Sequence, residues 1–302
     1  MPGQGSQRPG MMAQLFQYFP RLHHYLTVGS QWINDLYPPT VYDDAAQKKQ
    51  LDAITDTRVA QPTLGLVDMA TADVLSGFGI RPDMLAGHSY GELVSLWYAG
   101  CFDERQLLDL SRQRGEAILN ACDEDPGTMA AIMADADTVQ GMIGAADVVI
   151  ANINGPRQTV ISGSTEAVKG AIANLKAAKI RGKQIPVACA FHSPLVAGAA
   201  TTLEAVLRDM PIRPPKVDVW SNYTAQIYSD DVDALRRTLA AHVANPVRFV
   251  DQINNMVEAG AKIFVEVGPG RVLTGLVSRI APKDDTLMVA ASGDGSGQIS
   301  DL

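Results

Sequence analysis

The sequence has few residues that could hold a metal or form a disulfide framework. It contains 3 cysteines and 5 histidines in 302 residues. The cysteines, Cys101, Cys122 and Cys189, are odd in number and show no metal-ligand spacing. This pattern predicts reduced, chemically inert thiols in a cytoplasmic protein, and no metal site.

Long apolar runs and an excess of positive charge are also missing. No stretch approaches the roughly 18 apolar residues that a membrane span needs. No basic segment followed by an apolar one opens the chain, so nothing in the sequence suggests secretion. The net charge of −8 argues against broad nucleic-acid binding. With 46% hydrophobic residues, the chain is long enough to bury a sizeable core.

Both ends of the sequence differ from the rest of it. The chain opens directly on a glycine-rich loop, "MPGQGSQRPGMM", with no strand before it, and its last residues, 291–302, are linker-like. We therefore expect a domain excised from a longer, multidomain polypeptide.

The central part of the chain has a different rhythm from its surroundings. Outside residues 127–190, apolar periodicity predicts helices and short strands of a large α/β unit. Within that range the predicted order is β-α-β-β-α-β, the split βαβ pattern of a small ferredoxin-like unit. The predicted elements of the small unit are 128–134, 137–144, 147–154, 158–164, 165–178 and 183–190.

These elements predict an α/β fold in two parts. Residues 1–126 and 191–302 form the large, α/β-hydrolase-like unit, and residues 127–190 form the inserted ferredoxin-like unit. The insert carries a net charge of +2 against −10 for the remainder. A locally basic unit suits an anionic partner, although lysines scattered over helix surfaces would give the same sum.

One pentapeptide, Gly87-His88-Ser89-Tyr90-Gly91, fits the pattern G-x-S-x-G between a predicted strand (83–86) and a predicted helix (91–100). A strand that enters a helix through a tight turn leaves no room for side chains two residues either side of the tip. The tip serine then projects above the helix N-terminus, where main-chain N–H groups can bind an oxyanion. We interpret Ser89 as a nucleophile. The alternative is a helix cap, because Ser89 and Glu92 also match the capping box S-x-x-E.

A serine nucleophile needs a base, and position separates the histidines. His23 and His24 lie in a polar helical stretch and are expected to be solvated. The side chain of His88 should diverge from that of its neighbour Ser89, and His242 near a helix end suits a structural role. His192 directly follows a predicted strand, where α/β folds place sites. From position alone it could equally be a base or a core histidine.

Six motifs occur in order along the chain with long gaps between them. Together they resemble the malonyl-CoA:acyl-carrier-protein transacylases and the acyltransferase domains of polyketide and polyunsaturated-fatty-acid synthases, over nearly the whole length. The motifs are "PGQGSQ" (2–7), "GHSYGE" (87–92), "RG" (114–115), "AFHSP" (190–194), "NPVRF" (245–249) and "VEVGPGRVLTGL" (265–276).

The resemblance implies roles for the residues at these motifs. Ser89 matches the family nucleophile and His192 the family base. Gln4 shapes the oxyanion hole together with the main-chain N–H of Tyr90. No acidic third member is expected, because the family orients the imidazole through main-chain carbonyls, here in the "NPVRF" loop. Arg248 in that loop is common in polyketide relatives.

Substrate choice is also implied by the resemblance. Arg114 becomes the residue that binds the free carboxylate of a malonyl group through two parallel charge-assisted bonds. On sequence alone, Arg112 and Arg114 would both be solvated helix charges. Phe191 should fill the space of an α-methyl branch, although one methyl group is worth only about 1–3 kcal/mol. Cys189 stands where relatives often have histidine.

The remaining expectations concern the cleft and the partners. His88 and Asn154 are expected to line the cleft, with Asn152 in the same "NINGP" motif, although asparagines in a turn would give the same pattern. Malonyl-CoA is the expected donor and a phosphopantetheine-bearing acyl carrier protein the acceptor, with no bound cofactor. Two rivals stay open: a serine hydrolase or editing thioesterase, which predicts a carboxylate at His192, and an inactive docking module.

Overall fold

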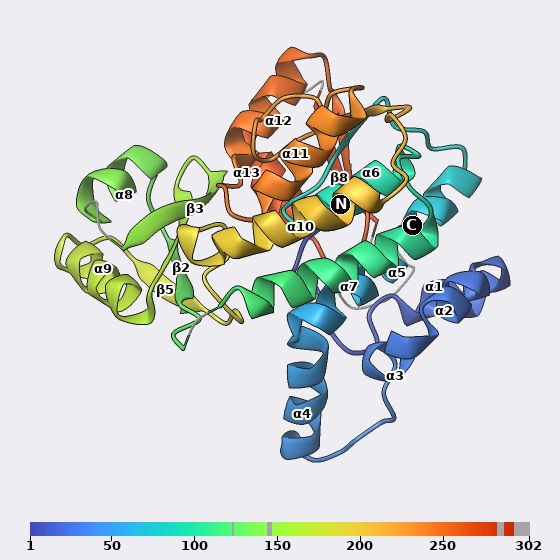
Figure 1. The fold of residues 1–302 in the computed structure, drawn as a ribbon, viewed down its shortest axis with the longest axis horizontal. Coiled ribbons are helices and arrows are strands. Elements are labelled where there is room, and N and C mark those ends of the chain that lie inside the picture. The colour runs from blue at the N-terminus through green and yellow to red at the C-terminus, as the bar shows by residue number, and fades with distance from the viewer. Residues whose placement is uncertain (123, 144–146, 283–286, 293–302) are drawn as a thin grey trace.

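The computed structural model describes residues 1–122, 124–143, 147–282 and 287–292. Helices α5 and α7 pack side by side through the centre of the larger part, and α10 lies against α7 (Figure 1). None of the helices in the described ranges combines the length and apolarity needed to cross a lipid bilayer. The last part of the expected linker-like tail, residues 293–302, falls outside the described residues.

The larger part is mostly helical, with two pairs of short parallel strands. Strand β1 pairs with β6, and β7 pairs with β8. The strands are β1 (Met84–Ala86), β6 (Asp218–Trp220), β7 (Ile263–Glu266) and β8 (Met288–Ala291). The helices are α1 (Ala13–Tyr18), η1 (Pro20–Leu22), α2 (His23–Val28), η2 (Ser30–Trp32), α3 (Ile33–Leu36), α4 (Asp44–Thr55), α5 (Thr57–Gly77), α6 (Gly91–Tyr98), α7 (Glu104–Asn120), η3 (Pro194–Val196), α10 (Ala197–Asp209), α11 (Val232–His242), α12 (Phe249–Glu258) and α13 (Val272–Ile280).

The smaller part is a four-stranded antiparallel sheet with strand order β3-β4-β2-β5. It packs against two helices and lies to one side of the larger part (Figure 1). Its apolar core is a cluster of its own, centred on Ile132, Ile161 and Leu175. The elements are β2 (Thr128–Ile132), α8 (Ala136–Ile143), β3 (Val148–Gly155), β4 (Gln158–Gly163), α9 (Thr165–Ala177) and β5 (Gly182–Ile185).

Two elements differ from the predicted ranges by more than two residues at one end or both ends. The strand expected over 183–190 ends at Ile185, because Pro186 has no N–H to donate to a neighbouring strand. The helix expected over 63–80 begins at Thr57, where the side chain of Asp56 accepts a hydrogen bond from the Arg58 N–H and caps the helix.

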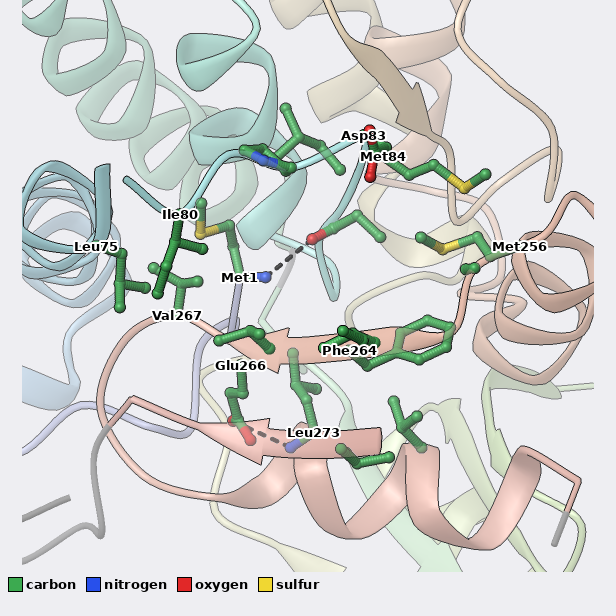
Figure 2. Close-up of a pocket in the computed structure, with 18 of the residues that line it drawn as sticks. Met1, Leu75, Ile80, Asp83, Met84, Met256, Phe264, Glu266, Val267 and Leu273 are labelled. Atoms are coloured by element: carbon green, nitrogen blue, oxygen red, sulfur yellow. Dashed lines mark hydrogen bonds between the residues drawn. The ribbon is translucent and has the colours of Figure 1, made fainter. Parts of the chain in front are cut away.

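A largely apolar cavity of about 570 Å³ lies between β1 and β7 (Figure 2). Met84, Met256, Phe264 and Leu273 are among the residues that line it. Met1 and Ala86 also line the cavity, and the Met1 ammonium donates to the Ala86 carbonyl at 2.8 Å. Neither Ser89 nor His192 lines this cavity, so it is distinct from the site described next.

Candidate active site

The turn between β1 and α6 is as tight as the glycine spacing predicts. Ser89 adopts a left-handed backbone conformation, with φ of 50°. A Cβ at Gly87 would overlap the main chain of Gly91, and a Cβ at Gly91 would overlap the carbonyl of Met1. Side chains are thus excluded on both sides of the tip, and backbone strain is concentrated at the serine.

The structure brings Ser89 and His192 together from positions far apart in the chain. Ser89 Oγ lies 2.8 Å from His192 Nε2, within the range for proton transfer. The cap position of α6 is Tyr90, with no side-chain cap, so the alternative interpretation of Ser89 as a helix cap is wrong. The hydroxyl faces an imidazole instead of the helix N–H groups.

The other nitrogen of His192 faces main-chain carbonyls. Nδ1 lies 3.1 Å from the carbonyl oxygen of His242 and 3.0 Å from that of Asn245. A protonated Nδ1 can donate to both, which leaves Nε2 with a free lone pair toward Ser89. Burial lowers the pKa of His192 to about 3, and the positive charge of Arg114 acts in the same direction. The ring is therefore a neutral base at physiological pH.

The two arginines of α7 lie in opposite environments. Arg112 is half-exposed and donates to both carboxylate oxygens of Glu116, at 2.7 and 2.8 Å. Arg114 is 4% exposed, and no carboxylate of the described residues lies within 4.0 Å of its guanidinium. Burial lowers the pKa of Arg114 to about 10, so it still carries its charge at neutral pH. A buried cation without a carboxylate partner is suited to bind an anionic ligand.

His88 and Asn154 connect the elbow to the small sheet. His88 Nε2 lies 2.7 Å from Asn154 Oδ1, and the His88 ring meets Phe249 edge to face. The adjacent Ile153 N–H donates to the Val247 carbonyl at 2.9 Å. The side chain of His88 therefore diverges from Ser89, as expected, and β3 is joined to the loop that carries Asn245.

Two of the remaining predicted residues, Gln4 and Tyr90, lie at or beside the same turn. Gln4 Nε2 donates to Thr57 Oγ1 at 3.1 Å, and a Cβ on the preceding Gly3 would overlap the His88 carbonyl. The Tyr90 hydroxyl is buried 2.8 Å from Ser111 Oγ, so only the main chain of Tyr90 remains at the turn. Phe191 is 9% exposed. The oxyanion roles of Gln4 and Tyr90 stay predictions.

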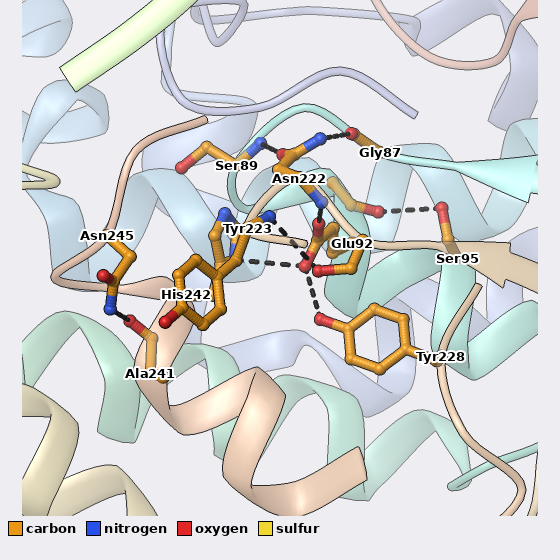
Figure 3. Close-up of polar contacts among 12 residues, drawn as sticks. Gly87, Ser89, Glu92, Ser95, Asn222, Tyr223, Tyr228, Ala241, His242 and Asn245 are labelled. Atoms are coloured by element: carbon orange, nitrogen blue, oxygen red, sulfur yellow. Dashed lines mark hydrogen bonds and ion pairs between the residues drawn. The ribbon is translucent and has the colours of Figure 1, made fainter. Parts of the chain in front are cut away.

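Two buried residues near the elbow were missed as site residues by sequence reasoning. Asn222 Oδ1 accepts from the Ser89 N–H at 2.6 Å, and Asn222 Nδ2 donates to the Gly87 carbonyl at 2.8 Å (Figure 3). Glu92, seen from the sequence only as part of a capping box, is fully buried beneath them. Asn222 lies two residues after β6, and that position at the carboxyl edge of a sheet is the signal that could have found it.

Comparison with known families places the chain among acyl transferases. Residues 1–291 match the family described as acyl transferase domain. The malonyl CoA-acyl carrier protein transacylase of Escherichia coli (strain K12) is 34% identical over 309 residues, which cover 100% of this chain and 97% of that protein. The protein of the same name from Bacillus subtilis (strain 168) is 32% identical over 297 residues, or 96% and 92%.

A similar sequence also occurs inside a much larger protein. One polyunsaturated fatty acid synthase polypeptide of Thraustochytrium sp. is 34% identical over 274 residues, which are 88% of this chain and 10% of that polypeptide. The chain thus spans about a tenth of that relative's length.

Solved structures give the same result for the fold. The malonyl-CoA:acyl carrier protein transacylase of Xanthomonas oryzae matches with a TM-score of 0.88 at 28% identity, covering 98% of this chain and 94% of that one. A malonyl-transacylase solved with a type II polyketide synthase acyl-carrier protein matches at 0.87 and 32% identity, covering 100% and 97%. The mixed α/β fold predicted from the sequence is confirmed.

Proposed function

Since the chain belongs to the acyl transferase domain family, we propose that it moves a malonyl group from malonyl-CoA to the phosphopantetheine thiol of an acyl carrier protein. The observation that carries the proposal is the 2.8 Å contact between Ser89 Oγ and a neutral, buried His192. The buried charge of Arg114 favours malonyl as the acyl group.

In the first half-reaction, His192 Nε2 takes the proton of Ser89 Oγ while Oγ attacks the thioester carbonyl carbon. The carbonyl oxygen becomes an oxyanion, which the Tyr90 N–H and Gln4 stabilise. The C–S bond then breaks, the proton on Nε2 passes to the leaving CoA sulfur, and a malonyl ester remains on Ser89. During this step the carbonyls of His242 and Asn245 stabilise the imidazolium through Nδ1–H.

The second half-reaction reverses the first with a different thiol. His192 takes the proton of the phosphopantetheine thiol, the sulfur attacks the ester carbonyl, and the proton returns to Ser89 Oγ as the C–O bond breaks. Water must be kept from the ester between the two steps. A narrow cleft between the two parts of the fold, with His88 and Asn154 in its wall, would serve that purpose.

Two residues are assigned to selectivity. Arg114 binds the free malonyl carboxylate bidentately, an interaction that an acetyl group cannot make. Phe191 occupies the space of an α-methyl branch and disfavours methylmalonyl. Because one methyl group is worth only about 1–3 kcal/mol, this second preference is the weaker one.

We also assign two parts to the fold, from the order of its elements, its separate cores and the geometry of the elbow. The order β2-α8-β3-β4-α9-β5, the antiparallel arrangement and the separate core support a ferredoxin-like unit over 127–190. The strand–elbow–helix turn supports an α/β-hydrolase-like assignment for 1–126 and 191–302. The relative within a large synthase polypeptide supports origin in a multidomain protein.

The rival interpretation as a triad hydrolase lacks its third member. It requires a carboxylate at His192 Nδ1, whereas the described residues place two main-chain carbonyls there. An editing thioesterase without a triad would differ from a transferase in the fate of the ester.

The test follows the acyl group by mass. The protein is mixed with malonyl-CoA, the intact mass is recorded, and a carrier protein bearing phosphopantetheine is then added. We expect one malonyl group on the parent protein, its transfer to the carrier thiol, and no label on Ser89→Ala. Prompt hydrolysis would instead support the thioesterase, and label on Ser89→Ala would overturn Ser89 as the nucleophile.

A further inference from the structure

The carboxyl group of Glu92 is the centre of a buried polar cluster directly beneath the elbow (Figure 3). Oε1 accepts a hydrogen bond from the Asn222 N–H. Oε2 accepts from the Tyr228 hydroxyl at 2.6 Å and lies 3.1 Å from His242 Nδ1. Three partners from distant parts of the chain thus meet at one carboxyl. We call Glu92, Asn222, Tyr228 and His242 the Glu92 cluster.

Asn222 connects Glu92 to the nucleophile. Its main chain is held by Glu92, while its side chain accepts from the Ser89 N–H and donates to the Gly87 carbonyl, on either side of His88 just before the tip. The backbone at Ser89 is strained, with a positive φ, and such a conformation persists only when its surroundings fix it. Asn222 provides part of that fixation.

His242 connects Glu92 to the base. Its carbonyl accepts from His192 Nδ1, and its ring packs on the His192 ring with centroids 5.3 Å apart. The His242 ring is itself fixed by Glu92 through Nδ1, since its Nε2 has no partner among the described residues. The placement of the His192 ring therefore depends on a contact made by Glu92.

The charges around Glu92 favour a neutral pair that shares one proton. Burial raises the pKa of Glu92 to about 8, against the hydrogen bonds from Asn222 and Tyr228 and the charge of Arg114. Burial likewise lowers the pKa of His242 well below its ordinary value, and His192 and Arg114 add to that effect. One proton between Glu92 Oε2 and His242 Nδ1 satisfies both groups without a buried net charge.

We infer that Glu92 is a positioning residue, which holds the nucleophile through Asn222 and the base through His242 and so fixes the Ser89–His192 distance. The inference rests on the proposed acyl transfer. Its physical basis is that proton transfer needs heavy atoms about 2.6–3.2 Å apart. A displacement of about 1 Å can reduce a rate about 100-fold.

The test compares two substitutions that differ in hydrogen-bonding capacity. Glu92→Met has a similar length but makes neither the hydrogen bonds to Asn222 and Tyr228 nor the polar contact with His242, whereas Glu92→Gln can accept from Asn222 and donate to His242. We expect the single-turnover rate constant for malonyl-enzyme formation, per folded molecule, to fall about 30- to 100-fold in Glu92→Met. Glu92→Gln should recover most of that rate, with KM for malonyl-CoA within about twofold in both.

Ser95→Ala is the matched control. Ser95 is equally buried on the same helix, but its Oγ donates only to the Gly91 carbonyl, outside the Glu92 cluster. If Glu92 had a merely structural role, its substitution would change stability, but the rate per folded molecule would equal that of Ser95→Ala. Equal rates in Glu92→Met, Glu92→Gln and Ser95→Ala would overturn the inference.

A second pair decides the question if Glu92→Met does not fold. His242→Gln keeps a side-chain donor toward Glu92, and His242→Leu removes it, while both keep the main-chain carbonyl. We expect acylation by His242→Leu to be at least about tenfold slower than by His242→Gln. Equal rates would contradict the role of Glu92. Label on Ser89→Ala, in contrast, would contradict the proposed function itself.

Discussion

Two carboxyl groups in this protein are equally hidden from solvent but have opposite surroundings. Glu92 and Asp68 are both 0% exposed. Glu92 has three polar partners and lies beside the nucleophile and the base. Asp68, on α5, has no hydrogen-bond partner for either oxygen among the described residues. Its neighbouring charges are the buried Met1 ammonium and Glu266, next to the apolar cavity.

The difference shows what distinguishes a buried acid that is part of a site. Burial raises the pKa of both groups: to about 8 for Glu92, where the donors of Asn222 and Tyr228 oppose the rise, and well above its ordinary range for Asp68, which has no such donors among the described residues. Burial also lowers the pKa of the Met1 ammonium. Burial alone therefore does not mark function, and convergent donors are the informative observation.

The largest expected effect is on stability, and it tests the comparison of Glu92 with Asp68 directly. Glu92→Met leaves the buried donors of Asn222 and Tyr228 without an acceptor and the His242 ring without its polar partner, so we expect the free energy of unfolding to fall by about 3 kcal/mol. Asp68→Leu keeps a similar side-chain volume and removes no hydrogen bond among the described residues. We therefore expect the free energy of unfolding to change by less than about 1 kcal/mol. Urea unfolding measures both, and equal losses would show that the two environments do not differ energetically.

The next effect concerns Arg114, the cation of the same region. Arg114→Ala should lower kcat/KM for malonyl-CoA about 100-fold, or about 2.7 kcal/mol, because the bidentate carboxylate contact is lost. Acetyl-CoA has no free carboxylate, so its kcat/KM should change less than about threefold. Arg112→Ala is the control, since Arg112 lies on the same helix but is paired with Glu116. Equal losses with both substrates would remove Arg114 from malonyl recognition.

Much of the site could be predicted because its geometry is encoded locally. The glycines of the elbow exclude side chains within five residues of chain, and the predicted small-unit elements correspond to a sheet and two helices. His192 is identified by the family motifs; the strand predicted directly before it ends at Ile185, so its position after a strand is not a valid signal. These signals come from residues that lie close together in the sequence, so one sequence is enough to reveal them.

The Glu92 cluster could not be predicted because its contacts are long-range. Asn222 lies 133 positions from the Ser89 N–H that it accepts from, and Tyr228 lies 136 positions from Glu92. The local sequence indicates a helix-capping role for Glu92. Only tertiary packing turns its side chain toward His242 instead. Likewise, the periodicity of the short strands indicates a large α/β unit but not that its strands form two separate pairs, β1·β6 and β7·β8, beside a cavity.

The smallest expected effect is the pH dependence of acylation, for which His192 is the base. Because the neutral form is the base and burial lowers the pKa of His192 to about 3, acylation per folded molecule should change less than about twofold between pH 5 and 7. A histidine with the ordinary pKa of about 6.5 would lose about nine-tenths of its base form by pH 5.5.

The pH dependence of stability differs from that of the rate. The unfolded chain binds a proton at His192 below about pH 6.5, whereas the folded protein does not bind it until about pH 3. The contribution of His192 to stability is therefore present above pH 6.5 and is lost as the pH falls toward 3, so rates must be normalised to the folded fraction. Stopped-flow acylation with circular dichroism at each pH makes that separation, and a tenfold loss of rate per folded molecule at pH 5.5 would contradict a buried neutral base.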